Sequence, residues 1–327
     1  MIEGHRIAAL LPRSELPAAV PTQVLPDGAW LAPGFIDVQV NGGGDVLFND
    51  DPTPDAIAAI VRAHRQLRND CAAAHPDQRY AGQDARRARR RAAGSCPPTR
   101  AFSASTSKVR SCHREKPGVH DPAMFRRPTR EDSELLTARA GRRHARHARA
   151  RAGSGGLHRA ARQGAAFGFR SDTRWQPMRK PRRRWRKGLT GFTHLFNAMR
   201  QPESREPGPV VAALEAPGAW FGMIVDGHHV DPAMLRLALR GAARPMLVTD
   251  AMPTVGGSRS TFLLYGQEIS VRDGRCTRMD GTLAGAHLDM ASAVRNCVEL
   301  LGVPLTQALR FASTEPANFL GLGGSSA

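Results

Sequence analysis

Asp250 stands at the end of an apolar, strand-like segment, PMLVTD (245–250), in this 327-residue chain. A strand of a parallel barrel that ends in Asp directs the carboxylate to the mouth of the barrel, where catalytic residues lie. A carboxylate in that position can take a proton from water and return it to a leaving group. The alternative is that Asp250 caps the next helix, because Asp commonly begins that element.

Two histidines in DGHH (226–229) form a second candidate for chemistry. Neighbouring residues of a strand point to opposite sides, so only one of His228 and His229 can face a site. The other is expected to be structural.

These residues need a framework of strands and helices. GAWLAPGFIDVQVNGGGD (28–45) contains a short apolar strand closed by glycines, and TPDAIAAIVRAHRQL (53–67) has apolar residues at helical spacing behind a Thr-Pro start. After residue 187 short buried strands alternate with amphipathic helices. This order predicts an α/β fold, either a parallel barrel or a doubly wound sheet.

The formal charge of +18 is local. Segments 67–115 and 138–187, called the basic islands below, hold 28 of the 47 basic residues and 5 of the 29 acidic ones, so the rest of the chain has a net charge of −5. The islands have neither a helical apolar stripe nor a strand alternation. They are read either as a basic linker or as a nucleic-acid-binding arm, although aromatic residues are sparse there and no nucleic-acid motif is present.

Other classes of protein are disfavoured. The five cysteines show no CxxC pair, which argues against a disulfide framework or a zinc ribbon. No apolar run reaches the ~18 residues of a membrane span, so no membrane partner is expected. The N-terminus lacks the layout of a secretory signal, and a cytoplasmic location is therefore expected.

Six segments together carry a resemblance: LAPGFIDVQVNGGG, KPGVHDPAMFRRPT, GLTGFTHLFNAM, VDGHHVDPAML, LVTDAMPTVGG and GTLAGAHLDMASAVRN. In this order they closely resemble the N-acetylglucosamine-6-phosphate deacetylases of the amidohydrolase superfamily, over about 2–66, 116–137 and 188–323. The resemblance implies a (β/α)8 TIM-like barrel over 31–323 beside a small β-sandwich that begins with 1–30. Because the chain ends at GLGGSSA, the last sandwich strands are expected to be missing.

The resemblance also implies an activity, the hydrolysis of N-acetylglucosamine 6-phosphate to glucosamine 6-phosphate and acetate in amino-sugar catabolism. One divalent metal ion would activate the water, and Asp250 would act as general base and then as acid. His194 in GFTHLF matches a metal ligand of the family, although a lone histidine is also a common core residue. Zinc is expected first, with iron, manganese and cobalt as alternatives that accept similar ligands.

Further site residues follow from the same resemblance. His229 would donate to the substrate carbonyl, and Arg205 would bind the 6-phosphate unless it is an ordinary surface charge. Gln39 and Asn41 replace the HxH that holds a second metal in many superfamily members, which indicates a single-metal site. The other implied substrate contacts are Asn197, Ala198, His120, Leu283, Ala284 and Gly285. The family also suggests a homodimer.

Two metal ligands of the family are missing from the sequence. Strands resembling IHFEGPF, with a Glu ligand, and ending in GHS, with a His ligand, belong inside the basic islands but do not occur there. With suitable synonymous codons, residues 105–112 read out of frame give His-Phe-Glu-Gly-Pro-Phe-Leu, and the same offset across Asp172 and Thr173 forces His or Tyr. Near 67–78 the other offset gives a segment like the family's next barrel strand.

We therefore predict that both basic islands are frame-shifted translation and are poorly ordered. The barrel is then incomplete, and the chain as written lacks a tight metal site and the activity that depends on it. Two other functions stay open. One is nucleic-acid binding through the islands, and the other is a different amidohydrolase activity in which Arg205 has no phosphate to bind.

Overall fold

A computed structural model describes residues 1–3, 6–16, 20–67, 69–74, 191–199, 201–320 and 322. His120, the segment 116–137 and nearly all of both basic islands lie outside these residues. The first island contributes one described element, the strand β6 (Asn69–Ala74). Whether the islands are frame-shifted and poorly ordered therefore stays a prediction, as does the division into barrel and sandwich.

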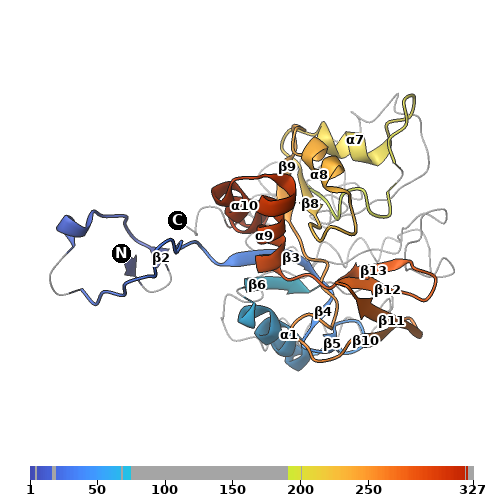
Figure 1. Cartoon of the computed structure of the whole chain (residues 1–327), viewed down its shortest axis with the longest axis horizontal. Coiled ribbons are helices and arrows are strands. Elements are labelled where there is room, and N and C mark those ends of the chain that lie inside the picture. Colours follow the sequence, from blue (N-terminus) through green and yellow to red (C-terminus); the bar gives the residue numbers. More distant parts are fainter. Residues whose placement is uncertain are drawn as a thin grey trace, which may run out of the picture.

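Parallel strands alternate with helices in the body of the protein (Figure 1). β3 (Phe35–Val40) pairs in parallel with β6, and α1 (Pro54–Gln66) connects them. β7 (Gly191–Phe192), β8 (Trp220–Met223) and β9 (Arg244–Leu247) form a second parallel set in that order. The predicted α/β class is confirmed for the described residues.

The two sets meet beside the segment that follows β9. Val40 and Ala251 form a parallel bridge, and the amide of Asp250 donates to the carbonyl of Gln39 at 3.0 Å. The carboxyl ends of β3 and β9 therefore lie at one edge, and β7 joins them there through β8. Polar side chains that follow these strands are brought together by this arrangement.

Helix α1 forms where the sequence predicts it. Thr53 caps the helix by accepting a hydrogen bond from the amide of Ala56 at 3.2 Å, and Pro54 occupies the first turn. Ile57 and Ile60 lie on its buried side and pack with Val40 of β3. The predicted strand in 28–45 is narrower in the structure, because only Phe35–Val40 pairs as a strand before the short hairpin β4 (Gly42–Gly43) and β5 (Val46–Leu47).

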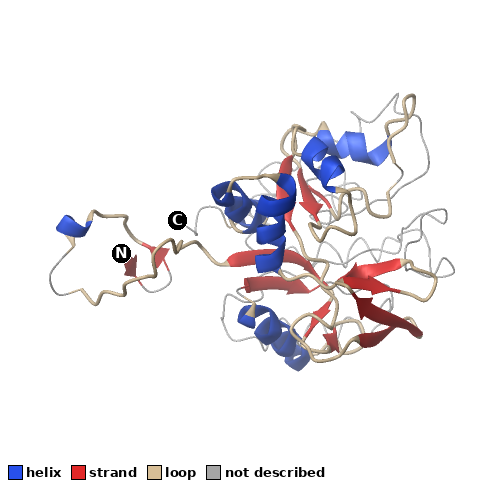
Figure 2. Cartoon of the chain, viewed as in Figure 1, coloured by secondary structure: helices blue, strands red, loops and turns tan. Residues whose placement is uncertain are grey.

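The main core lies between β7–β9 and the helices that flank them (Figure 2). Phe221, Met223 and Leu247 are fully buried there. They pack with helices α7 (Gly208–Leu214), α8 (Pro232–Ala238), α9 (Met290–Leu301), α10 (Leu305–Ala312) and α11 (Thr314–Phe319). Truncating a buried Phe to Ala typically costs ~3–5 kcal/mol, so this packing holds the strand ends in place.

A four-stranded antiparallel sheet follows β9, which the sequence patterns above did not predict. Its strands are β10 (Thr261–Leu264), β11 (Gln267–Arg272), β12 (Arg275–Thr277) and β13 (Leu283–Ala286). Tyr265-Gly266 and Asp273-Gly274 make the tight turns, all with positive φ. The sheet brings β13 back to the body, where Ala286 bridges to Ala251.

The N-terminal residues run out from the body (Figure 1). They contain the two-residue strands β1 (Ile2–Glu3) and β2 (Arg6–Ile7) and the 3-10 helix η1 (Arg13–Glu15). Among the described helices of the whole chain, none is long and apolar enough to cross a membrane.

Candidate active site

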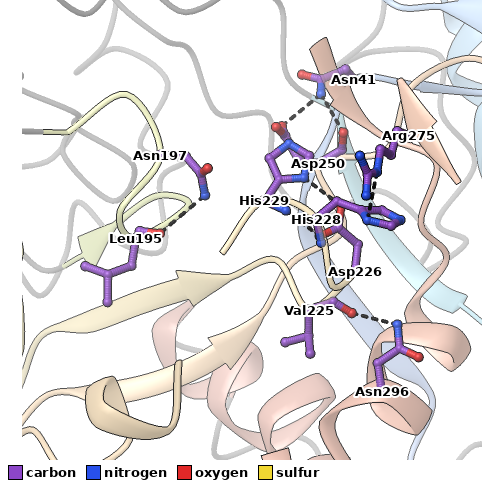
Figure 3. A network of polar contacts seen from close by, with 10 residues as sticks. All are labelled: Asn41, Leu195, Asn197, Val225, Asp226, His228, His229, Asp250, Arg275 and Asn296. Atoms are coloured by element: carbon purple, nitrogen blue, oxygen red, sulfur yellow. Dashed lines mark hydrogen bonds and ion pairs between the residues drawn. The ribbon is translucent and has the colours of Figure 1, made fainter. Parts of the chain in front are cut away.

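Asp250 is held by the side-chain amides of Gln39 in β3 and of Asn41 directly after it. Its Oδ1 accepts hydrogen bonds from Gln39 Nε2 at 2.6 Å and from Asn41 Nδ2 at 2.9 Å. Asn41 Nδ2 also donates to the main-chain oxygen of Asp250 at 3.1 Å, and the backbone of Asp250 has a positive φ of 53°. Asp250 is only 8% exposed, so these contacts fix a buried carboxylate in one orientation. Figure 3 shows the contacts with Asn41.

Gln39 also connects this carboxylate to the strand that carries His194. Its Oε1 accepts a hydrogen bond from the hydroxyl of Thr193, directly before His194. His194 follows β7, is 8% exposed and has a positive φ of 30°. Thr193, the residue before the predicted metal ligand, therefore shares a polar network with the predicted base at the carboxyl ends of β7, β3 and β9.

A second carboxyl lies beneath the first. Asp37 is fully buried and accepts hydrogen bonds from the amide of Gln39 at 3.0 Å and from the hydroxyl of Thr249. Burial raises the pKa of Asp37 to about 7, against the hydrogen bonds from Thr249 and Gln39 that lower it. Asp37 thus ties β3 to the residue before Asp250.

The loop after β8 holds a buried His–Asp pair. His229 Nδ1 lies 2.6 Å from Asp226 Oδ2, and the backbone amides of His228 and His229 each donate to Asp226 Oδ1 at 2.9 Å. The loop is anchored to α9, where Asn296 Nδ2 donates to the carbonyl of Val225 at 2.8 Å. The negative charge of Asp250 acts on His229, so the pair belongs to the same site (Figure 3).

The two histidines of DGHH have different surroundings, but they lie in a loop after β8 and not in a strand, so the strand alternation used in the prediction does not apply. His228 Nδ1 accepts a hydrogen bond from Arg275 Nε of β12 at 3.1 Å. This contact links the loop to the antiparallel sheet, whereas His229 is paired with Asp226. The assignment of a substrate role to His229 rather than His228 stays a prediction.

The chain is similar to deacetylases of N-acetylated amino-sugar phosphates. It is 33% identical over 302 residues to an N-acetylgalactosamine-6-phosphate deacetylase of Shewanella sp. (strain ANA-3), which covers 89% of this chain and 74% of the relative. That similarity decides the family. The chain belongs to the N-acetylglucosamine/N-acetylgalactosamine-6-phosphate deacetylases, and the resemblance seen in the sequence is confirmed.

Other members of this deacetylase family agree. The chain is 27% identical over 338 residues to an N-acetylglucosamine-6-phosphate deacetylase of Haemophilus influenzae, covering 98% of the chain and 85% of the relative. The solved N-acetylglucosamine-6-phosphate deacetylase of Pasteurella multocida superposes with a TM-score of 0.82 at 25% identity, over 99% of this chain and 85% of that one.

A point mutant of the Mycobacterium smegmatis enzyme in complex with N-acetyl-D-glucosamine-6-phosphate superposes with a TM-score of 0.69 at 28% identity, over 89% and 78% of the two chains. No family model matches the chain.

Three of the predicted substrate residues of this family member lie in β13. Leu283, Ala284 and Gly285 run beside the Asp250 segment, where the amide of Ala286 donates to the carbonyl of Asp250 at 3.0 Å. Gly285 has a positive φ of 69°, and a Cβ on it would lie 2.6 Å from the Met252 side chain and 3.0 Å from the Asp250 carbonyl oxygen. Only glycine fits this position without displacing the site.

Asn197 and Ala198 lie in the loop after His194. The amide of Asn197 donates to the His194 carbonyl at 2.9 Å, and Ala198 has a positive φ of 51° and is exposed. Arg205 is exposed on the next loop, which is closed by reciprocal backbone bonds between Glu203 and Glu206 at 3.2 and 3.1 Å. Their contacts with substrate stay predictions, and His120 is outside the described residues.

Membership in this family implies a divalent metal ion. The described residues do not fit one by themselves, because no three His, Cys, Asp or Glu side chains among them gather in a metal-binding group. The predicted ligand His194 is present, whereas the other two ligands are expected only from the out-of-frame readings of the islands.

Four residues of the network were not recognised in the sequence as site residues: Asp37, Thr193, Asp226 and Thr249. Two of them carried a signal. Asp37 stands at i and i+2 spacing with Gln39, which places both side chains on one face of β3. Asp226 precedes His229 by three residues in a loop, a spacing at which an Asp can accept from the following amides. Thr193 and Thr249 become relevant only when the strands are assembled.

Proposed function

We propose that this protein is an amide hydrolase that removes the acetyl group of N-acetylglucosamine 6-phosphate and releases glucosamine 6-phosphate and acetate. The observation that carries the proposal is the buried carboxylate of Asp250, held at a strand end by Gln39 and Asn41, in a chain of this deacetylase family. The comparisons do not favour nucleic-acid binding through the islands.

Asp250 supplies the proton transfers of this reaction. We assign the transfers to this carboxylate, which Gln39 and Asn41 hold in place through Oδ1. The carboxylate takes a proton from the attacking water as the water oxygen bonds to the acetyl carbon. It returns that proton to the sugar nitrogen as the C–N bond breaks, so one group acts as base and then as acid.

His229 is suited to stabilise the carbonyl oxygen as negative charge develops there. Burial of the ring lowers its pKa, but the hydrogen bond and charge of Asp226 and the charge of Asp250 outweigh burial, so the pKa of His229 lies above its ordinary value. A ring that keeps its proton can donate to an oxyanion, which is the largest single contribution in many acyl-transfer enzymes.

The finer assignments belong to the same proposal. We place the described strands in a (β/α)8 barrel and assign the 6-phosphate to Arg205 with the loop residues Asn197 and Ala198. His194, with a Glu and a His restored by a corrected reading frame, would hold one divalent ion, for which zinc is our first choice and which would activate the water. A homodimer completes the proposal.

The epimer N-acetylgalactosamine 6-phosphate is a second candidate substrate. The relative that decides the family is named for that sugar and is 33% identical, against 27% for the Haemophilus influenzae relative named for the glucosamine epimer. The two sugars share the amide and the phosphate and differ at one ring hydroxyl, so the chemistry assigned to Asp250 is the same for both.

Release of acetate from both phosphorylated sugars and from their unphosphorylated forms tests the proposal. It should be measured on the chain as written and on a frame-corrected chain loaded with zinc. The corrected chain is expected to prefer the phosphorylated sugars, and Asp250→Asn should lower its turnover at least ~100-fold. Equal turnover without phosphate, or full activity of Asp250→Asn, would overturn the proposal.

A further inference from the structure

Asp226 controls both the backbone and the ring of His229. One carboxylate oxygen, Oδ1, accepts the amides of His228 and His229 at 2.9 Å, and the other, Oδ2, lies 2.6 Å from His229 Nδ1. The side chains of Asp226 and His229 are 5% and 6% exposed. A contact made by both oxygens, away from water, leaves the ring little freedom to turn.

This contact also determines which ring nitrogen carries a proton. A carboxylate can only accept, so Nδ1 must be the donor while Asp226 is ionised. Burial raises the pKa of Asp226, but the hydrogen bond and charge of His229 and the two backbone amides bring it below the ordinary value. Asp226 is therefore ionised at neutral pH, and Nε2 is the nitrogen that gains or loses a proton.

Other charges around the ring do not replace Asp226. Asp250, after β9, attracts a proton to His229 from another element. On β12, Arg275 bonds to His228, and burial raises the pKa of Cys276 to about 12, so this thiol is uncharged at neutral pH. Among these groups only Asp226 contacts the ring nitrogen directly.

We propose that Asp226 is a positioning residue for deacetylation: it holds Nδ1–H of His229 so that Nε2 is presented toward the site of Asp250. The inference rests on the proposed function of His229, but the contact itself can be tested without catalysis. Asp226 touches no reacting atom in this assignment and acts only through the ring.

Long-range ¹H–¹⁵N spectra of the histidine rings in the full chain test the assignment. His229→Asn identifies the signal by its loss. Above its pKa, the His229 ring is expected to carry its proton on Nδ1, and the ring should titrate above the ordinary value of 6.5.

The variant Asp226→Asn should reverse this pattern. Its single amide oxygen must still serve the two backbone amides, so its NH2 group faces Nδ1, which then becomes the acceptor. The neutral ring should carry its proton on Nε2, and its pKa should fall by about one unit or more. Asp231→Asn is the matched control, because Asp231 lies in the same loop but caps α8 through the amide of Ala233 at 2.7 Å. It should leave the His229 spectrum unchanged.

A neutral wild-type His229 ring that carries its proton on Nε2 overturns the inference. An Asp226→Asn variant in which His229 titrates as in the wild type also overturns it. If Asp226→Asn does not fold, the wild-type tautomer alone decides. In an active, frame-corrected chain the variant should lower kcat about tenfold or more with little change in KM. If the corrected chain without this substitution shows no turnover while its His229 ring carries the proton on Nδ1, the result counts against the proposed function and leaves this inference standing.

Discussion

Asp250 depends on neighbours that are uncharged amides. Gln39 donates to its Oδ1 and accepts from Thr193, so the orientation of this one amide is determined at both ends. Asn41 donates to the same oxygen. The amides stabilise a buried carboxylate without adding a positive charge, which would lower the affinity of the carboxylate for a proton.

Replacing Gln39 by Leu removes a donor to Asp250 and an acceptor for Thr193 at once. Both groups are buried, so the free energy of unfolding should fall by about 1–3 kcal/mol in urea denaturation. Gln267→Leu, at an exposed position of β11, is the control and should change it by less than ~0.5 kcal/mol. Equal effects of the two substitutions would show that the contacts of Gln39 with Asp250 and Thr193 contribute nothing to stability.

Asp37 should make the protein less stable as pH rises. Its pKa in the folded chain is about 7 and its ordinary value is 3.8, so between these values the folded state holds a proton that the unfolded state has lost. The stability it contributes is therefore present at low pH and is lost as pH rises from about 4 to about 7.

Asp37→Asn mimics the protonated form and should remove this dependence. As pH rises from about 4 to about 7, the free energy of unfolding of the variant should increase relative to that of the wild type by roughly 1 kcal/mol for each pH unit. Urea unfolding at several pH values measures this difference. Asp51→Asn removes an exposed carboxylate instead and should keep the wild-type slope. A parallel pair of curves for wild type and Asp37→Asn would contradict the prediction.

At the scale of elements, β13 must approach the Asp250 segment closely, and Gly285 permits this. Gly285→Ala introduces a Cβ against Met252 and the Asp250 carbonyl in addition to the strain of a positive φ. Gly281→Ala has a similar φ of 81° with nothing within 4 Å, so it carries the strain alone. In each variant the strain of a positive φ should lower the free energy of unfolding by ~1–2 kcal/mol. Gly285→Ala should lower it further because of the added contacts, as measured by thermal unfolding. A smaller loss of stability for Gly285→Ala than for Gly281→Ala would show that β13 can shift to accommodate the Cβ without destabilising the protein.

Elements with local signals were predictable, and those that depend on assembly were not. α1 has its proline and its apolar spacing within its 13 residues and its cap directly before them, and it forms as expected. The turns at Tyr265-Gly266 and Asp273-Gly274 carry local hairpin signals, whereas the alternation of strands and helices after residue 187 predicted no antiparallel sheet. The placement of Asp250 at a strand end followed from the sequence, whereas its partners on β3 are about 210 residues away in the chain and needed the fold.

At the scale of the whole molecule, we predict that the reading frame decides whether the site is complete. Resequencing the gene should reveal single-base slips flanking 67–115 and 138–187 when it is compared with an intact relative. The corrected protein should bind about one metal ion per chain by elemental analysis, because it regains the Glu and His ligands, whereas the chain as written should bind none tightly. An unbroken frame as written, with a metal bound, would contradict the prediction.

Gln39 and Asn41, which donate to the Asp250 carboxylate, lie before the islands in the chain, and Asp250 lies after them. When a second single-base shift restores the frame that a first one changed, only the codons between the two are misread. If the slips are gene decay rather than sequencing errors, they would therefore spare the proton-transferring half of the enzyme, and a lineage carrying them would need a few single-base reversions, rather than the rebuilding of a catalytic centre, to recover the ancestral trait.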